Sequence, residues 1–334
     1  MITLGIETSC DETSFALYEN GSMNRNGSIL SSKIFSQSDI HSKFGGVVPE
    51  IASRNHIIKL EPLLTEILTE SSINLKDIDL IGVTSSPGLI GALFIGVAFA
   101  KGLGYVNNIP VVPINHLQGH TLAAEITHND LKPPYLSLII SGGHTHIYSV
   151  DVAYNFRLVA RTVDDAVGES FDKVAKMLGF GYPGGPNIEN AAKTGQKNKV
   201  QLPIGMKNKL NFSFSGLKTA TMRAVEEKRY SKEDIAASFQ STAVETLLLK
   251  TLKAVEKIGI RKIIICGGVA SNNYLRNIIK EKFPKDIQVF FPIHKLCTDN
   301  GEMIAYTAYK LYRLRKFLSL NGTAYDSDPL MDRY

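Results

Sequence analysis

The sequence lacks the features of several protein classes. Its 334 residues include no tryptophan and three cysteines (Cys10, Cys266 and Cys297), which form no CxxC pair. So few cysteines argue against a disulfide scaffold and are typical of a protein from a reducing compartment. The N-terminus has no basic segment followed by a long apolar core, so the sequence does not indicate a secretory signal peptide.

Long apolar runs and a strong charge of one sign are also missing. The longest apolar stretch, Gly88–Ala100, is interrupted by glycines and is too short to span a bilayer. We therefore expect a cytoplasmic protein with no membrane partner. The 37 Lys and Arg residues exceed the 32 Asp and Glu residues by a net charge of +5. This small surplus permits an RNA partner but does not establish one.

The sequence does contain a strand-and-turn pattern that occurs three times, in which a short apolar strand runs into a turn of small residues. The three segments are Ile2–Thr13, Tyr135–Thr145 and Lys262–Asn272. The first two continue into return strands, Ser14–Tyr18 and His146–Val150, which predicts hairpins. The third continues into a helical pattern. The repetition, in a chain long enough for two domains, suggests two lobes of similar build.

Helical and strand patterns alternate along the chain, which predicts α/β lobes with mixed sheets. In the first half we expect two helices and two strands, at Ile51–Ser71, Leu89–Tyr105, Asp79–Ser85 and Val111–Ile114. In the second half we expect helices at Ser170–Leu178, Ser215–Lys228, Asp234–Ile258 and Asp299–Phe317. Gly179–Leu210 is expected to be mostly loop with one short helix.

The boundary between the lobes is expected in the polar, proline-bearing stretch Thr127–Pro134. Residues 1–130 would then form an N-terminal lobe, and residues 131–334 a C-terminal lobe with a helical insertion at about 165–258. We expect the final helix to pack back toward the N-terminal lobe.

Two glycine-bearing turns suit the binding of a nucleotide. In Ser141–Thr145 (SGGHT), glycines let a ligand approach backbone N–H groups that form an anion-binding concavity. Gly267-Gly268 precedes a helix whose positive end would begin near Asn272. We expect the two turns on opposite sides of a cleft, with an adenine nucleotide between two lobes. Taken singly, such a turn is more often a plain turn, and neither matches a P-loop or GxGxxG pattern.

The order of the three turns resembles the superfamily of sugar kinases, actin and the heat-shock chaperone ATPase. This resemblance implies an α/β protein with a two-lobed actin-like ATPase fold. The nucleotide and a metal would then lie in the cleft between the lobes.

His116 and His120 form the spacing of a possible metal site. They are four residues apart at the expected start of a helix, so both imidazoles would lie on one helix face and could bind one metal. Leu117 stands where a zinc protease of the HExxH type needs its glutamate, which argues against that activity. The plain alternative is that both histidines are ordinary polar residues of a helix.

The spacing does not identify a third ligand. Asp299 lies near the expected start of the last helix, where a carboxylate is often only an N-cap. His144 and His146 point to one side of a strand and compete with it, although His144 lies in the phosphate turn. Two histidines and a carboxylate leave open positions that suit iron or zinc acting on substrate oxygens.

A series of motifs in order along the chain identifies a family resemblance. They are GIETSCDET (5–13), GGVVPE (45–50), NHLQGH (115–120), SGGHT (141–145), FDK (171–173), YPGGP (182–186), FSFSGLK (212–218), GGV (267–269) and CTDN (297–300). Together they resemble the universal tRNA threonylcarbamoyladenosine synthesis family of the bacterial type, formerly called O-sialoglycoprotein endopeptidases.

The resemblance implies an enzyme, a tRNA N6-adenosine threonylcarbamoyltransferase. Its substrate would be threonylcarbamoyl-AMP, and its acceptor the exocyclic amine of the adenosine beside the anticodon in tRNAs that read codons starting with A. One divalent metal, iron or zinc, would be held by His116, His120 and Asp299 at the threonylcarbamoyl end. The partners would be tRNA, an inactive paralogous subunit and a small P-loop ATPase.

The resemblance also implies a nucleotide site and a reacting centre. The nucleotide end would lie along Ile139, Ile140, Ser141, Gly142, Gly143, Asp172, Gly185, Glu189 and Asn272. Glu189 departs from the bacterial pattern, which usually has Asp there. Asp11 and Glu12 would stand near the reacting centre, where Glu12 could orient or deprotonate the amine. Alternatively, these two carboxylates shape the hairpin or hold magnesium for a nucleotide.

Two other functions compete with this interpretation. One is a small-molecule kinase of the same fold, and the other is a nucleotide-binding scaffold that only assembles partners. The histidine pair with Asp299 argues against a kinase, because kinases of this fold hold magnesium through water and carboxylates. A tRNA surface would draw on basic residues such as Arg54, Lys218, Arg223, Lys228, Arg229, Arg313, Arg315 and Lys316, with a strong dependence on salt.

Overall fold

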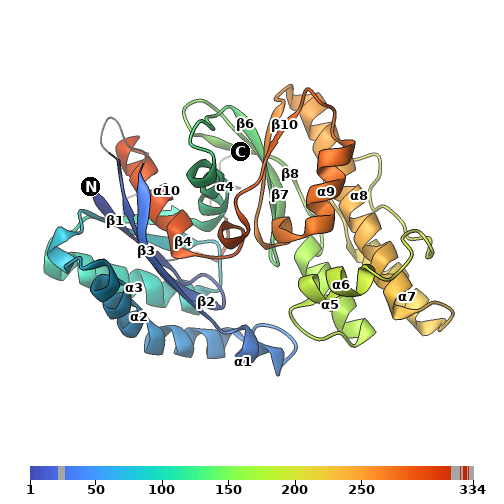
Figure 1. Ribbon diagram of the computed structural model, residues 1–334, viewed down its shortest axis with the longest axis horizontal. Helices are drawn as coiled ribbons and strands as arrows, with labels where there is room; N and C mark the ends of the chain where they lie inside the picture. Colours follow the sequence, from blue (N-terminus) through green and yellow to red (C-terminus); the bar gives the residue numbers. More distant parts are fainter. Residues whose placement is uncertain (22–26, 317–323, 325, 329, 331–334) are drawn as a thin grey trace. The chain divides into compact units, whose positions relative to one another are not determined.

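The computed structural model describes residues 1–21, 27–316, 324, 326–328 and 330 (Figure 1). The chain divides into two compact units. Unit 1 contains Met1–Asp130 and the described residues from Thr298 onward, and unit 2 contains Leu131–Cys297. From the sequence we grouped residues 298 onward with the C-terminal lobe. In the structure they belong to unit 1.

Unit 1 is built on a five-stranded sheet with the order β3-β2-β1-β4-β5. The strands are β1 (Ile2–Glu7), β2 (Glu12–Glu19), β3 (Ser28–Ser36), β4 (Leu80–Ser86) and β5 (Val111–Asn115). The first three are antiparallel neighbours, and β1, β4 and β5 run parallel. The helices are α1 (Ser38–Ser42), α2 (Pro49–Ser71), the 3-10 turn η1 (Leu75–Asp77), α3 (Ile90–Asn107), α4 (His116–Thr127) and α10 (Gly301–Arg313).

The helices of unit 1 cover its sheet, and α10 lies directly on β1. A Cβ atom added to Gly5 would stand 2.3 Å from the carbonyl oxygen of Gly301, so this close approach requires glycine. By length and composition alone α3 could cross a membrane, since it continues beyond the expected apolar stretch to Asn107. It packs on β4 and α2 and buries Leu93 and Val97 in the core of unit 1.

Unit 2 is built on a second five-stranded sheet, with the order β10-β9-β6-β7-β8. Its strands are β6 (Tyr135–Ile140), β7 (Thr145–Val150), β8 (Phe156–Arg161), β9 (Lys262–Cys266) and β10 (Gln288–Phe290). Its helices are α5 (Val167–Leu178), α6 (Gly184–Ala192), α7 (Ser215–Glu226), α8 (Lys232–Ile258), η2 (Gly268–Ser271), α9 (Asn273–Lys282) and η3 (His294–Leu296).

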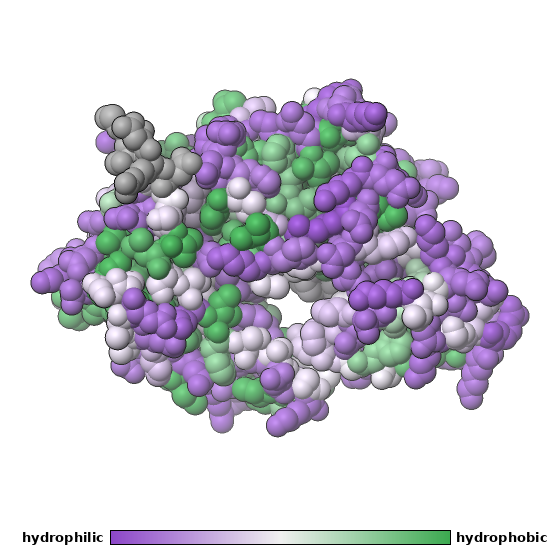
Figure 2. Space-filling model, in the orientation of Figure 1, coloured by the Kyte–Doolittle hydropathy of each residue, from purple (hydrophilic) through white to green (hydrophobic). Residues whose placement is uncertain are grey.

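The two sheets share one plan. In each, three consecutive strands form an antiparallel meander. A fourth strand pairs parallel with the first strand of that meander, and a fifth strand pairs parallel with the fourth. The predicted α/β class with two mixed sheets is therefore confirmed. Each sheet has its own buried cluster of apolar side chains, and hydrophilic residues cover much of the face seen in Figure 2.

The predicted elements agree with the observed ones apart from their ends. Both hairpins form, and each predicted helix lies within a few residues of an observed one. The last helix begins at Gly301 and ends at Arg313, short of the expected bounds, of which Phe317 lies outside the described residues. Strands β3, β8 and β10 were not predicted, because β3 carries mixed polar residues without clean alternation and β10 has three residues.

Candidate metal centre and nucleotide turns

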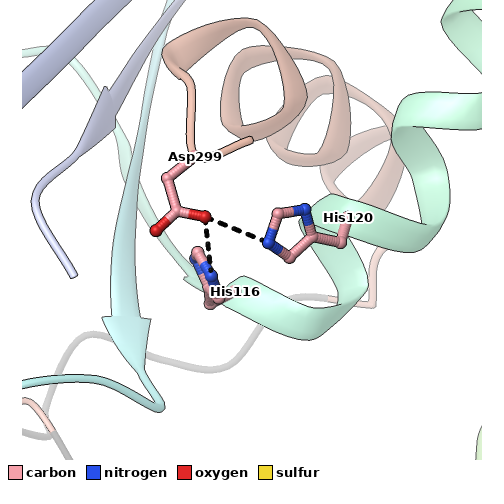
Figure 3. Close-up of side chains that lie close together, drawn as sticks. All are labelled: His116, His120 and Asp299. Atoms are coloured by element: carbon pink, nitrogen blue, oxygen red, sulfur yellow. Dashed lines mark ion pairs between the residues drawn. The ribbon is translucent and has the colours of Figure 1, made fainter. Parts of the chain in front are cut away.

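Three side chains of unit 1 converge around one carboxylate oxygen. Oδ1 of Asp299 lies 3.4 Å from Nε2 of His116 and 3.1 Å from Nε2 of His120. The ligand atoms of the three residues all lie within 4.8 Å of one another. Figure 3 shows both imidazoles on one side of α4 and the Asp299 carboxylate pointing at them from the segment before α10.

The helix caps explain why these three side chains are available. Oδ1 of Asn115 accepts hydrogen bonds from the backbone N–H groups of Leu117 and Gln118 at 2.9 and 3.1 Å, so α4 begins at His116. At α10 the capping side chain is Asn300, whose Oδ1 accepts from Met303 N at 2.8 Å. The alternative that Asp299 serves as the N-cap is therefore wrong, and its carboxylate faces the histidines instead.

A second carboxylate fixes the ring of His116 from the other side. Oε2 of Glu7 lies 3.1 Å from His116 Nδ1, and the same oxygen accepts a hydrogen bond from Thr84 Oγ1 at 2.6 Å. The Ser9 backbone N–H donates to the other oxygen of Glu7 at 2.5 Å. Since an ionised carboxylate can only accept, Nδ1 of His116 carries the proton. Nε2 faces Asp299 and would offer its lone pair to a metal once the second ring proton is displaced, as in carboxylate–histidine–metal arrangements.

The contacts of His120 test whether the group fits a metal. Its side chain is fully buried, and within the described part of the chain neither ring nitrogen makes a hydrogen bond. Nε2 approaches Asp299 closely but not with the geometry of a hydrogen bond. A buried imidazole that makes no hydrogen bond is unfavourable, and a bound cation would supply a partner for Nε2. Two imidazoles and a carboxylate therefore fit a divalent metal.

The electrostatics of the group favour a positive charge. Burial lowers the pKa of His116, but the carboxylates of Asp299 and Glu7 raise it well above its ordinary value. Burial and the charge of His116 lower the pKa of His120. Burial alone would raise the pKa of Asp299, yet both histidines hold it well below its ordinary value. A metal would thus replace the ring proton of His116 that the carboxylates of Asp299 and Glu7 stabilise.

Asp11 ends the β1–β2 turn and Glu12 begins β2, where the charge of Asp299 reaches the Glu12 carboxylate. Asp11 is buried, and Oε1 of Glu12 accepts a hydrogen bond from Ser36 Oγ at 3.3 Å. Burial raises the pKa of Glu12 well above its ordinary value, and the charges of Asp299 and Asp11 add to this effect. Unit 1 therefore contains both the candidate ligands and the two carboxylates expected near the reacting centre.

The turn after β6 in unit 2 has the form of an anion cradle. Ile139 and Ile140 are fully buried in β6, so they offer a ligand their backbone rather than their side chains. The Ser141 N–H donates to His144 O at 2.8 Å and closes the turn. Gly142 and Gly143 are exposed, with open space where a Cβ would stand, so a phosphate could approach their N–H groups.

The second glycine turn lies beside the first. Gly267 has φ +90°, and a Cβ there would stand 2.5 Å from the carbonyl oxygen of Ile140. Strands β6 and β9 are parallel neighbours, with Ile139 opposite Cys266, so the turns that follow them share one edge of one sheet. The expectation that these turns lie on opposite sides of a cleft is therefore wrong.

The remaining expected nucleotide residues of unit 2 set the ends of two helices. Oδ1 of Asp172 accepts from Gly184 N at 2.7 Å, at the start of α6. Oε1 of Glu189 accepts from Asn273 N at 2.8 Å, at the start of α9. Gly185, beside these contacts, has open space around its Cα.

Asn272 also sets a helix end. Its Oδ1 accepts from Leu275 N at 2.8 Å, and its Nδ2 donates to Gln240 Oε1 at 2.9 Å. The start of α9 follows the glycine turn at Gly267-Gly268 closely in sequence and contacts η2, so the positive end of this helix lies near that turn.

The competing ligands His144 and His146 belong to unit 2. Their ring centroids are 5.3 Å apart, and Nδ1 of His146 lies 3.4 Å from the hydroxyl of Tyr148. The cluster of possible ligands found among the described residues consists of His116, His120 and Asp299 and includes neither of them.

Glu7 is a candidate functional residue that we did not predict from the sequence. It ends an apolar strand and is fully buried. A carboxylate in that position needs a partner, because burying an unpaired charge is very costly. The position of Glu7 at the end of an apolar strand could have indicated a buried, paired carboxylate. Its partner, His116, could not be identified without the fold.

Comparisons with known proteins agree along nearly the whole chain. The family model described as tRNA N6-adenosine threonylcarbamoyltransferase matches residues 28–306. A curated protein of that name from Thermosipho africanus is 49% identical over 319 residues, covering 94% of this chain and 95% of the relative. Another from Fusobacterium nucleatum is 47% identical over 339 residues, covering 97% of each.

Solved structures with low sequence identity share the fold. Component A of the (R)-2-hydroxyglutaryl-CoA dehydratase of Acidaminococcus fermentans is 15% identical with a TM-score of 0.59, covering 95% of this chain and 100% of that chain. Full-length HypF is 14% identical with a TM-score of 0.62, covering 97% of this chain and 56% of that chain. These likenesses confirm the actin-like ATPase fold.

Proposed function

Since the chain belongs to the tRNA N6-adenosine threonylcarbamoyltransferase family, we propose that it transfers the threonylcarbamoyl group of threonylcarbamoyl-AMP to tRNA. The acceptor is the exocyclic amine of the adenosine beside the anticodon in tRNAs that read codons starting with A. The observation that carries the proposal is the buried group of His116, His120 and Asp299. A small-molecule kinase, the alternative on this fold, is not favoured by the relatives.

His116, His120 and Asp299 would hold one divalent metal, either iron or zinc. Bound there, the metal would polarise the carbamoyl carbonyl of the substrate. Glu7 keeps the proton on Nδ1 of His116 and so directs Nε2 toward the ligand position. The open coordination positions of a two-histidine, one-carboxylate set leave room for substrate oxygens.

The transfer exchanges one bond for another at the carbamoyl carbon. The amine nitrogen of adenosine bonds to that carbon, the bond from the carbon to the phosphate oxygen breaks, and AMP leaves. The leaving phosphate gains negative charge, which the N–H groups of Gly142 and Gly143 are suited to stabilise, together with the positive end of α9. The same region of unit 2, with Ile139, Ile140, Ser141, Asp172, Gly185, Glu189 and Asn272, would hold the nucleotide.

The proton lost by the amine requires an acceptor, and we assign this role to Glu12. Burial and the charges of Asp299 and Asp11 raise the pKa of Glu12, which makes its carboxylate a better proton acceptor, and a bound cation would lower that pKa again. Asp11 would orient the amine or the substrate beside it. The alternative in which both carboxylates shape the hairpin or hold magnesium predicts no change in proton transfer when Glu12 is replaced.

We also propose that the chain acts in the cytoplasm with an inactive paralogous subunit and a small P-loop ATPase. Support for a protein partner comes from α3, whose Ile90, Phe94 and Tyr105 are 53, 59 and 87% exposed along one face. An exposed apolar face of this kind is typical of an interaction site. The chain alone should therefore transfer slowly, and the added partners should raise the rate.

For tRNA, the basic residues named in the sequence divide into two groups. Arg54, Lys218 and Arg229 form ion pairs with neighbouring acidic side chains, which reduces the charge they offer to phosphates. The others are exposed, and they are Arg223, Lys228, Arg313, Arg315 and Lys316. Phosphate contacts by this second group would make tRNA binding weaken as salt rises.

The proposal is tested by incubating the chain and its partner proteins with threonylcarbamoyl-AMP labelled in the threonine carbons and with unmodified tRNA. Label should become attached to tRNAs that read codons starting with A, and not to tRNAs with another base beside the anticodon. ATP-dependent phosphorylation of a small molecule, with no label on tRNA, would refute the assignment.

A further inference from the structure

His56 on α2 bridges the two sides of the turn that carries Asp11 and Glu12. Its Nε2 lies 2.9 Å from the carbonyl oxygen of Cys10, and its Nδ1 lies 2.8 Å from Oγ1 of Thr13. The side chain of His56 is fully buried. Because a carbonyl oxygen can only accept, Nε2 carries the ring proton, and the Thr13 hydroxyl then donates to Nδ1. Both polar atoms of the ring are thus used to hold residues 10 and 13.

The burial of His56 keeps this arrangement in one protonation state. Burial lowers the pKa of the ring, although the Cys10 carbonyl and the charges of Glu7 and Asp11 act in the opposite direction. The ring is therefore neutral near pH 7, with one donor and one acceptor. A neutral imidazole in this tautomer matches a carbonyl on one side and a hydroxyl on the other.

The carbonyl groups on either side of Cys10 are held by backbone N–H groups of other segments. Leu89 N donates to Ser9 O at 2.8 Å, at the start of α3. Gln37 N donates to Asp11 O at 3.0 Å, just after β3. Three successive carbonyl groups of the turn are thus anchored by three different parts of unit 1. The contact with His56 is the one made by a side chain, so substitution can remove it.

We propose that His56 is a positioning residue for the transfer reaction. By fixing Cys10 and Thr13, it holds the intervening residues Asp11 and Glu12 in place, and Glu12 also contacts Ser36. Within the described residues, the hydrogen bonds of His56 go to Cys10 and Thr13 and not to the candidate metal ligands or the glycine turns of unit 2. The inference rests on the proposed function, since it assigns a role to Asp11 and Glu12 in transfer.

Graded variants separate positioning from stability. His56→Phe removes both contacts, whereas His56→Gln keeps an amide donor for Cys10 O, and Thr13→Val removes the hydroxyl contact. Ile67→Val, on the same helix and equally buried, trims the core without touching the turn. In steady-state transfer by the complete complex, kcat should fall about tenfold to a hundredfold for His56→Phe and less for His56→Gln and Thr13→Val.

The same measurements show what would overturn the proposal. KM for threonylcarbamoyl-AMP and the metal content per chain should stay at the unmodified level in every variant, and Ile67→Val should keep its kcat. The proposal is wrong if the His56 variants keep kcat, or lose it only in proportion to metal content or folded fraction. If His56→Phe does not fold, His56→Gln and Thr13→Val decide.

A measurement independent of activity keeps this inference separate from the function. If the unmodified complex transfers no label, the proposed function fails. The contacts of His56 with Cys10 and Thr13 can still be tested by ¹⁵N NMR of the full chain. The proposed contacts are supported by a protonated Nε2 and an unprotonated Nδ1. They are also supported by changed backbone amide chemical shifts at residues 10–13 in His56→Gln but not in Ile67→Val. The opposite tautomer or unchanged shifts contradict them.

Discussion

Glu7 on β1 and His116 on α4 are joined across 3.1 Å through Nδ1 of the imidazole, and both side chains are buried. This contact leaves Nε2 of His116 facing Asp299. Asp299 lies on the chain just before α10, so the candidate metal group depends on how β1, α4 and α10 pack together in unit 1. A carboxylate that never touches the metal would therefore control its binding.

Glu7→Gln should weaken metal binding without removing a ligand. The amide is similar in size to the carboxylate but loses the charge that keeps the proton on Nδ1 of His116. Outer-shell changes of this kind typically cost about 10- to 100-fold in metal affinity. Competition with a chromogenic chelator measures the affinity, and Glu61→Gln on the exposed face of α2 is the matched control. Equal affinities for the two variants would contradict this role of Glu7.

Metal affinity should rise with pH. Although burial lowers the pKa of His116, Asp299 and Glu7 raise it well above the ordinary value, so the metal-free group holds a proton near neutral pH. Metal binding must then release that proton, and affinity should fall by about tenfold for each pH unit below the raised pKa. Chelator competition between pH values of about 5.5 and 8 tests this. An affinity independent of pH would show that no proton is displaced.

Glu125→Gln should destabilise unit 1. Oε2 of Glu125 on α4 accepts from the Tyr306 hydroxyl at 2.9 Å and lies 3.0 Å from Nζ of Lys310, both on α10. The Glu125 side chain is fully buried, so losing its charge should lower the free energy of unfolding by about 2 kcal/mol. Urea denaturation measures the change. Exposed Glu61→Gln should change it by less than about 0.5 kcal/mol.

Asp164→Ala should destabilise unit 2 in a way that depends on pH. Burial raises the pKa of Asp164, but hydrogen bonds from Ser213, Phe214 and Ser215 at the start of α7 bring it below the ordinary value. Its contribution is present above the ordinary carboxyl pKa and is lost as pH falls through the lowered one.

The loss on Asp164→Ala should therefore be about 1 kcal/mol at neutral pH and should shrink below about pH 4. Chemical denaturation at neutral pH and below about pH 4 measures the loss of stability, with exposed Asp130→Ala as the control. A loss of equal size at both pH values would mean that the carboxylate charge does not matter.

The parts of the fold that were predictable carry their signals locally. Apolar strands before small-residue turns predicted β1, β6 and β9, and the four-residue spacing placed His116 and His120 on one face of α4. These patterns depend on neighbouring residues in the chain. Edge strands such as β3 and the three-residue β10 were missed because their pairing, rather than their own pattern, makes them strands.

The assembly of the site was not predictable from spacing. Asp299 meets the histidines only because α10 packs against α4 and β1, and nothing near Asp299 in the chain reports that contact. The ordered family motifs supplied the choice of Asp299 over His144 and His146. The shared edge of the two glycine turns likewise follows from the parallel pairing of β6 with β9, a contact between distant segments.

The most direct test of metal-dependent transfer compares one preparation of the complete complex before and after its metal is removed. We expect the metal-free protein to attach no threonylcarbamoyl label to tRNA, and added iron or zinc to restore the reaction. Asp299→Ala should bind no metal and should not be restored, whereas the exposed His294→Ala should behave like the unmodified chain. Full transfer by the metal-free protein, or by Asp299→Ala, would contradict the account.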